Sequence, residues 1–156
     1  MKVLFLCTAN SCRSILCEAL FNHLAPTGLR AYSAGSEPKG FVHPLTLKAL
    51  ERTGVAFDGL SSKPIEAHAE LQPDLVITVC DKAAGEACPV FFGPALRAHW
   101  GLADPSEVTG SAAGIAAAFD ATVARIKTRI QAFLVLPLDQ LDAAALKTEL
   151  VRIGSL

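Results

Sequence analysis

A cysteine and an arginine enclose five residues near the start of the chain, in the run Cys7-Thr8-Ala9-Asn10-Ser11-Cys12-Arg13-Ser14. The apolar residues 3–6 precede this run, so the thiol ends a predicted strand and Arg13 opens a predicted helix. A loop of small residues at such a junction can turn its N–H groups inward and bind a tetrahedral oxyanion. Because the helix N-terminus and the guanidinium both favour negative charge, we expect Cys7 to be a thiolate nucleophile.

Three polar residues of this loop have separate expected roles. Arg13 offers a planar fork that matches two oxyanion oxygens. Ser14 either donates to the thiolate or caps the helix. Asn10 holds the loop through side-chain hydrogen bonds, because asparagine tolerates the backbone angles of tight turns. The cysteine–arginine spacing is common by chance, but its place between a strand and a helix makes it far more specific.

An aspartate follows the fourth predicted strand, in the run His99-Trp100-Gly101-Leu102-Ala103-Asp104-Pro105. From that loop, Asp104 can reach over the anion site and protonate a leaving oxygen as a general acid. Asp-Pro on its own is a common turn, and only its combination with the anion-binding loop favours catalysis. His99 and Trp100 are expected to support the loop.

Cys80 ends the third predicted strand, and Cys88 follows eight residues later. Two buried thiols, two metal ligands and a resolving pair are the three interpretations. Metal binding is disfavoured because the spacing is not C-x-x-C and no histidine lies close in sequence. A helix between the two would separate their Cα atoms by ~12 Å, whereas a disulfide needs ~4.4–6.8 Å. We therefore predict a redox switch that is ordered or helical when reduced and looped when oxidised, with Gly85 easing the unwinding.

The remaining composition bounds the class of protein. With 156 residues, 51% of them hydrophobic, the chain fits a single domain spanning 1–156. A net charge of −1 gives no general attraction to nucleic acid or to acidic membranes, and no apolar run approaches the ~20 residues of a membrane span. Five cysteines are an odd number for a disulfide framework and indicate a reducing cytoplasm. Cys12 is expected to be a spectator and Cys17 a packing residue.

Strands and helices alternate along the chain. Strands are predicted at 3–6, 30–34, 74–80 and 95–100. Helices are predicted at 14–24, 44–53 and 64–71, and a long helix has one apolar face that runs from Ile115 to Phe133. A C-terminal helical extension spans 137–156, and its helix is predicted at 141–153. This alternation predicts an α/β three-layer sandwich around a four-stranded parallel sheet. In the flavodoxin-like order 2-1-3-4 the first and third strands are neighbours ~4.8 Å apart, so Cys7 and Cys80 should lie side by side.

Four motifs together resemble the arsenate reductases built on the low-molecular-weight tyrosine phosphatase fold. They are VLFLCTANSCRS at 3–14, YSAG at 32–35, VITVCD at 76–81 and HWGLADP at 99–105. The resemblance implies that Cys7 is the nucleophile, Arg13 the oxyanion clamp and Asp104 the general acid, with Cys80 and Cys88 as a disulfide relay. It also implies arsenate as substrate, phosphate and sulfate as analogues, and no bound cofactor. Reducing equivalents would come from thioredoxin, or from glutathione with glutaredoxin as in other members. The protein is expected to be a monomer in the cytoplasm.

Some members of this family bind a potassium ion near positions matching Asn10, Glu18 and Ser33, aided by an aspartate on a following loop. Here that loop reads Ser61-Ser62-Lys63-Pro64. Our hypothesis is that the Lys63 ammonium replaces the ion and steadies Asn10 and Glu18, so that no metal is bound. A solvated surface lysine is the alternative.

Two other functions stay open at this point. A tyrosine phosphatase would need only Cys7, Arg13 and Asp104, but phosphatases of this fold carry tyrosines beside the Asp-Pro, and the one tyrosine here is Tyr32. Weak side activity on an artificial aryl phosphate is still expected. The second alternative is a non-enzymatic thiol or metalloid sensor, and the lack of a basic patch argues against direct DNA binding.

Overall fold

The parallel sheet of the protein has the predicted strand order. A computed structural model describes residues 1–80 and 94–156. Four parallel strands lie in the order β2-β1-β3-β4. Leu6 of β1 pairs with Ala34 of β2 on one side and with Thr78 of β3 on the other. The strands are β1 (Lys2–Cys7), β2 (Arg30–Gly35), β3 (Leu75–Thr78) and β4 (Leu96–His99).

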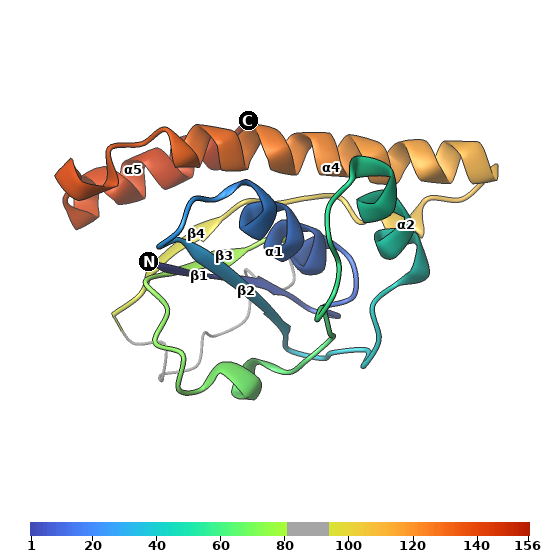
Figure 1. Cartoon of the computed structure of the whole chain (residues 1–156), viewed down its shortest axis with the longest axis horizontal. Coiled ribbons are helices and arrows are strands. Elements are labelled where there is room, and N and C mark those ends of the chain that lie inside the picture. Colours follow the sequence, from blue (N-terminus) through green and yellow to red (C-terminus); the bar gives the residue numbers. More distant parts are fainter. Residues whose placement is uncertain (81–93) are drawn as a thin grey trace.

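Helices cover the sheet unequally (Figure 1). α1, α2, α4 and α5 lie on one side of the sheet, and the short 3-10 helix η1 lies on the other. The α-helices are α1 (Arg13–Leu24), α2 (Pro44–Thr53), α4 (Ala112–Leu134) and α5 (Ala143–Gly154), and the 3-10 helices are η1 (Ile65–His68), η3 (Pro105–Glu107) and η4 (Leu138–Gln140). Among these helices none combines the length and apolar character needed to cross a bilayer.

The alternation of side chains along β1 creates two apolar layers. Val3 and Phe5 face the larger core under the α-helices, whereas Leu4 and Leu6 belong to the smaller cluster on the other face. In the larger core the aromatic rings of Phe5, Phe21, Trp100 and Phe133 pack in contact, with centroids 5.8–6.4 Å apart. A buried strand between two apolar layers gives Cys7 a rigid base.

Several predicted boundaries differ from the structure. The third strand stops at Thr78, although the Thr78 and Val79 carbonyls still accept the N–H groups of Trp100 and Leu102. The helix predicted at 64–71 is a 3-10 helix limited to Ile65–His68. Helix α1 begins at Arg13 with Cys12 at the N-cap position, so the prediction that Ser14 caps this helix is wrong.

Candidate active site

The loop from Cys7 to Ser14 joins the end of β1 to the start of α1. Its outer edge is fixed by segment 37–43, whose N–H groups donate to Thr8, Ala9 and Ser11 carbonyls at 2.9–3.0 Å. With these carbonyls engaged, the N–H edge of the loop is the side that an oxyanion would meet. Gly35 of β2 permits this packing, because a Cβ there would lie 2.5 Å from the Thr8 carbonyl.

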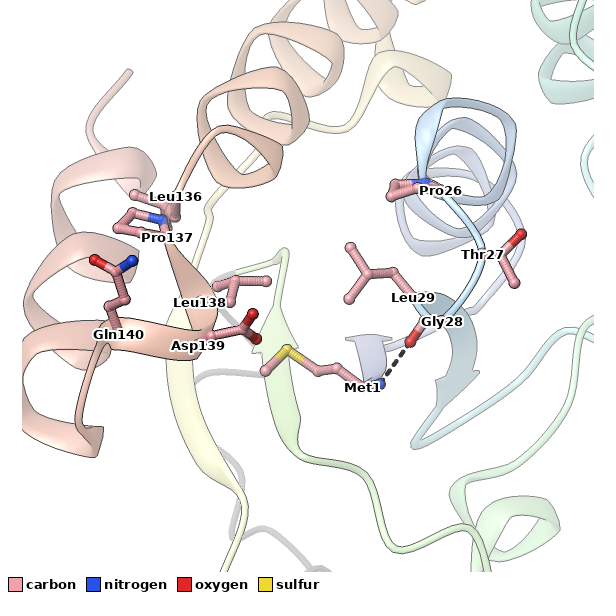
Figure 2. Close-up of a pocket in the computed structure, with 10 residues that line it drawn as sticks. All are labelled: Met1, Pro26, Thr27, Gly28, Leu29, Leu136, Pro137, Leu138, Asp139 and Gln140. Carbon is pink, nitrogen blue, oxygen red and sulfur yellow. Dashed lines mark hydrogen bonds between the residues drawn. The ribbon is translucent and has the colours of Figure 1, made fainter.

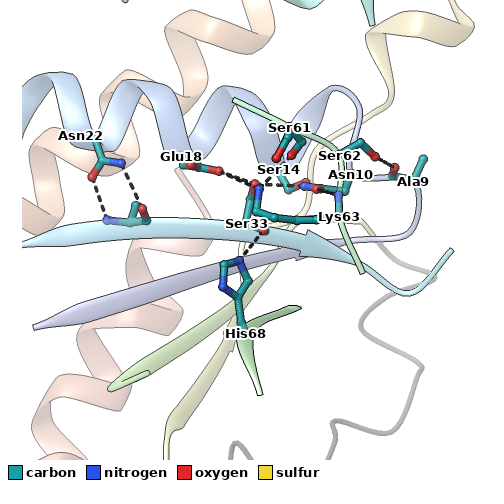
Figure 3. Close-up of polar contacts among 11 residues, drawn as sticks. Ala9, Asn10, Ser14, Glu18, Asn22, Ser33, Ser61, Ser62, Lys63 and His68 are labelled. Carbon is teal, nitrogen blue, oxygen red and sulfur yellow. Dashed lines mark hydrogen bonds and ion pairs between the residues drawn. The ribbon is translucent and has the colours of Figure 1, made fainter. Parts of the chain in front are cut away.

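Asn10 holds the loop from inside, as expected from the sequence. Its backbone has a positive φ of 45°, and its side chain is fully buried. The Asn10 amide donates to the hydroxyls of Ser14 (2.8 Å) and Ser33 (3.0 Å), and its carbonyl accepts the Lys63 N–H at 2.9 Å (Figure 3). Ser33 in turn donates to Glu18 at 2.5 Å. The hydroxyl of Ser14 is thus engaged by Asn10 at the back of the loop.

Lys63 reaches the same network through two groups. Its Nζ lies 3.8 Å from Oε1 of Glu18 and donates to the Ser61 carbonyl at 2.8 Å. Its main-chain N–H, and not its ammonium, bonds to Asn10. The ammonium therefore supplies positive charge beside Glu18. The described residues also contain no group of three or more His, Cys, Asp or Glu side chains that could hold a metal.

The thiols of Cys7 and Cys80 lie side by side, as the strand order predicts. The two side chains form a hydrogen bond, and both residues are buried. The hydroxyl of Thr8 lies 3.5 Å from the Cys80 sulfur. Cys7, Cys12, Cys17 and Cys80 are all reduced. The structure therefore brings together a loop thiol and a second thiol within reach for disulfide exchange.

In this ligand-free arrangement the neighbouring thiol of Cys80 opposes the thiolate form that the sequence predicts for Cys7. The hydrogen bond with Cys80 is the main cause that raises the pKa of Cys7 above its ordinary value of 9.0, and burial adds to it. The positive charge of Arg13 and the Thr8 N–H act in the opposite direction. Sequence reasoning placed Cys80 beside Cys7 but did not count its effect on the pKa of Cys7.

Arg13 and Asp104 face each other beside this thiol pair. One guanidinium nitrogen of Arg13 donates to the Leu102 carbonyl at 3.0 Å, and the other lies 3.5 Å from Oδ2 of Asp104. The other carboxylate oxygen, Oδ1, accepts the N–H and hydroxyl of Ser106 at 2.9 and 2.6 Å. Both charged side chains keep some exposure, 16% and 21%. Asp104 therefore has one oxygen held by its own turn and one directed at the clamp.

The remaining cysteines do not join this pair. Burial raises the pKa of Cys12 to about 12, although a hydrogen bond with Thr46 opposes the shift. Cys17 is packed in the core on α1, where burial raises its pKa as well. Cys88, and the redox switch predicted between Cys80 and Cys88, lie outside the described residues.

Several supporting residues were not found by sequence reasoning. Thr46 donates to the Ser11 carbonyl, Ser62 donates to the Ala9 carbonyl, and Ser106 holds Asp104. His68 bonds to the Ser33 carbonyl at 3.0 Å. Only Ser106 had a local signal, since a residue two positions after an aspartate is a usual partner in a capped turn. The others come from segments distant in sequence.

A separate hollow of about 540 Å³ lies at the opposite end of the strands (Figure 2). Met1, Leu29, Leu138 and Asp139 are among its lining residues, and the Met1 amine donates to the Gly28 carbonyl at 2.7 Å. Six residues of β1 separate this end from Cys7, which is roughly 20 Å of strand. The hollow is therefore not part of the thiol site.

Known proteins share both this sequence pattern and this fold. Residues 2–150 match the family described as low molecular weight phosphotyrosine protein phosphatase. An arsenate reductase of Bacillus subtilis is 35% identical over 109 residues, covering 70% of this chain and 77% of its own. A solved arsenate reductase in the phosphate-binding state has a TM-score of 0.70 and 28% identity, covering 85% of this chain and 95% of that chain. A thioredoxin-dependent arsenate reductase of Corynebacterium glutamicum has a TM-score of 0.60 and 30% identity, covering 83% and 61%. The chain therefore belongs to the low molecular weight phosphotyrosine protein phosphatase family, in which these similar relatives are arsenate reductases.

Proposed function

We propose that the protein reduces arsenate to arsenite through a relay of Cys7, Cys80 and Cys88. The observation that carries this proposal is the hydrogen bond between Cys7 and Cys80 at the carboxyl end of neighbouring strands. A phosphatase needs a single thiol at this place, whereas a reductase needs a second one in reach. The relatives named as arsenate reductases support the same assignment.

The first step forms a covalent adduct. Arsenate binds to the N–H groups of residues 8–14 and to the guanidinium of Arg13. The Cys7 proton passes to an oxygen of the bound arsenate, and Cys7 attacks the arsenic as a thiolate. An oxygen leaves the arsenic as water after Asp104 gives it a proton. The product is a sulfur–arsenic bond in which arsenic is still in the +5 state.

The second step transfers two electrons to arsenic. The Cys80 thiolate attacks the sulfur of Cys7, and the sulfur–arsenic bond breaks with its electron pair on arsenic. Arsenite leaves in the +3 state, and a Cys7–Cys80 disulfide remains. The Thr8 hydroxyl, 3.5 Å from the Cys80 sulfur, is placed to donate to the thiolate that attacks.

The third step moves the disulfide away from the anion site. The Cys88 thiolate attacks Cys80, Cys7 leaves as a thiolate, and the Cys80–Cys88 disulfide is reduced by an external dithiol. We propose thioredoxin as that donor, with glutathione and glutaredoxin as the alternative. The thioredoxin-dependent relative favours the first choice. No bound cofactor takes part in these steps.

We further propose that the protein works as a monomer in the cytoplasm, where its thiols stay reduced. Loop residues Asn10, Glu18 and Ser33 keep the anion site in shape, with the Lys63 ammonium in place of a cation. The contact of Lys63 with Glu18 is the observation in favour of that role.

One assay tests the assignment. Reduced thioredoxin with its reductase, or glutathione with glutaredoxin, is supplied with arsenate, and NADPH consumption is followed. We expect turnover with the wild-type protein, and a single turnover at most with Cys80→Ser or Cys88→Ser. Hydrolysis of an aryl phosphate at a similar rate by all three proteins, without arsenate turnover, would indicate a phosphatase. Binding of arsenate or arsenite without any turnover would indicate a sensor.

A further inference from the structure

Arg129 of α4 is a buried arginine that the proposed reaction does not use. Only 2% of its surface is exposed. Its guanidinium donates to the main-chain oxygens of Gly101 (3.1 Å), Gly154 (3.0 Å) and Leu156 (3.3 Å). A buried guanidinium needs such partners, because a buried charge without hydrogen bonds is costly. These bonds tie α4 to the end of α5 and to the segment that follows β4.

The carbonyl that Arg129 holds is next to one held by the clamp arginine. Arg129 bonds to Gly101, and Arg13 bonds to the following residue, Leu102, at 3.0 Å. The N–H of Leu102 donates to the Val79 carbonyl at 2.9 Å, next to Cys80. Asp104 comes two residues later. Two arginines from different helices thus hold neighbouring peptide groups of the segment that carries the proposed acid.

Helix α5 approaches the same segment very closely. A Cβ on Gly154 would lie 2.6 Å from the His99 carbonyl and 3.0 Å from the Trp100 ring. The indole N–H of Trp100 donates to the Leu150 carbonyl of α5 at 3.0 Å, and Lys147 donates to the Arg97 carbonyl. The end of β4 and its exit are therefore fixed against α5 by these two hydrogen bonds and by a close approach that a side chain at position 154 would obstruct.

We propose that Arg129 is a positioning residue for Asp104, and that it works together with α5. We call Arg129, Gly154 and Trp100 the C-terminal latch. The inference rests on the proposed function, in which Asp104 protonates the leaving oxygen. Proton transfer depends strongly on geometry, and a misplacement of about 1 Å can cost on the order of a hundredfold in rate. The latch fixes residues 99–102 from the core side. Asp104 is therefore held in position beside Arg13.

The kinetic test compares two arginines of the same helix. Arg129→Lys keeps a charge but loses the fork, whereas Arg125→Lys alters an exposed arginine that shares only the Leu156 oxygen. We expect Arg129→Lys to lower kcat for arsenate by about tenfold and to keep KM within about twofold of the wild-type value. A loss of this size is a part of the rate enhancement that a general acid usually supplies. Arg125→Lys should leave both constants unchanged.

A double-mutant cycle separates positioning from general damage. In an Asp104→Asn background, Arg129→Lys should cause no further loss, because the group that it positions is gone. An equal loss of kcat in both backgrounds would overturn the proposal. An unchanged kcat of Arg129→Lys in the wild-type background would overturn it too.

A second readout does not depend on arsenate turnover. The N–H of Leu102 bonds to Val79, and the N–H of Ser106 bonds to Asp104, so hydrogen exchange of these amides reports the segment directly. We expect Arg129→Lys and Gly154→Ala to speed their exchange by at least about tenfold, and Arg125→Lys to leave it unchanged. Unchanged exchange in both latch variants would refute the latch, even if the wild-type protein reduces arsenate. Faster exchange in the latch variants, together with a wild-type protein that shows no arsenate turnover, would refute the proposed function and leave the latch in place. If Arg129→Lys does not fold, Gly154→Ala still tests the latch, because this variant retains Arg129.

Discussion

The two sides of the anion-binding loop differ in how their polar groups are satisfied. On the Asn10 side, Asn10, Ser14 and Ser33 are completely buried and bonded to one another. On the Cys7 side, the Cys7 and Cys80 thiols share a hydrogen bond, and Arg13 and Asp104 keep partial exposure. The polar groups on the Asn10 side have their hydrogen-bond partners without a ligand. The groups on the Cys7 side must change their charge and partners during a reaction. A rigid Asn10 side thus keeps the loop in place while the side chains on the Cys7 side rearrange.

The largest expected effect concerns the nucleophile. Cys7→Ser should lower arsenate turnover and aryl phosphate hydrolysis by at least about a thousandfold, because removing a nucleophile removes the covalent step. Cys17→Ala changes a buried thiol in the core behind the loop and should retain turnover. Steady-state assays of both variants check this. Residual turnover above a hundredth of the wild-type rate in Cys7→Ser would contradict the assigned role.

The second effect concerns the Asn10 side. Asn10→Ala removes the partner of the buried Ser14 hydroxyl and of the Lys63 N–H, and one of the two bonds of Ser33, and should reduce the free energy of unfolding by about 2–3 kcal/mol. It should also weaken phosphate binding. Asn22→Ala is the control, because Asn22 also makes two hydrogen bonds with the main chain of Ala31, away from the loop. Urea unfolding and phosphate titration of both variants are the measurements. Equal phosphate affinity in the two variants would contradict the division of the loop into two sides.

The third effect concerns the thiol pair. Cys80→Ala removes the main cause that raises the pKa of Cys7, so the Cys7 thiolate should form at lower pH. Alkylation of Cys7 by iodoacetamide at neutral pH should then be about tenfold faster, as a drop of one pKa unit implies. The rate is followed against pH by mass spectrometry. A pH profile identical to that of the wild-type protein would show that Cys80 does not control the proton of Cys7.

The fourth effect tests the Lys63 ammonium. Lys63→Met leaves the largely buried carboxylate of Glu18 without its cation and should cost about 1 kcal/mol of stability. Lys48→Met, an exposed lysine on α2, is the control. Wild-type stability should be equal in KCl and NaCl at the same ionic strength. A stabilisation of the wild-type protein by potassium alone would contradict the replacement of an ion by Lys63.

The smallest effect is a pH dependence at the back of the network. Burial lowers the pKa of His68 below its ordinary 6.5, more than its bond to the Ser33 carbonyl raises it. The unfolded chain therefore binds a proton more readily, so this contribution to stability is complete above pH 6.5 and is lost as the pH falls through the lowered pKa. His68→Gln should flatten the pH dependence of unfolding in that window, and His23→Gln, an exposed residue, should not. Identical slopes for both variants would remove His68 from the network.

Local patterns accounted for the loop and the sheet. The alternation of helices with the strands predicted at 3–6, 30–34, 74–80 and 95–100 led to the correct strand order. The left-handed backbone of Asn10 was also expected from its residue type. The sequence did not show that the hydrogen bond with Cys80 raises the pKa of Cys7, because that effect depends on the side-chain geometry of two distant residues.

The sequence by itself determined the anion-binding loop and its family, since strand, turn and helix signals act over a few neighbouring residues. It also predicted Cys80 beside Cys7, because parallel strands have few possible orders. Only the tertiary structure decided which side chains hold the main chain around the site: Thr46 at Ser11, Ser62 at Ala9 and Arg129 at Gly101. Such contacts depend on how distant segments pack, and residue types alone do not specify that packing.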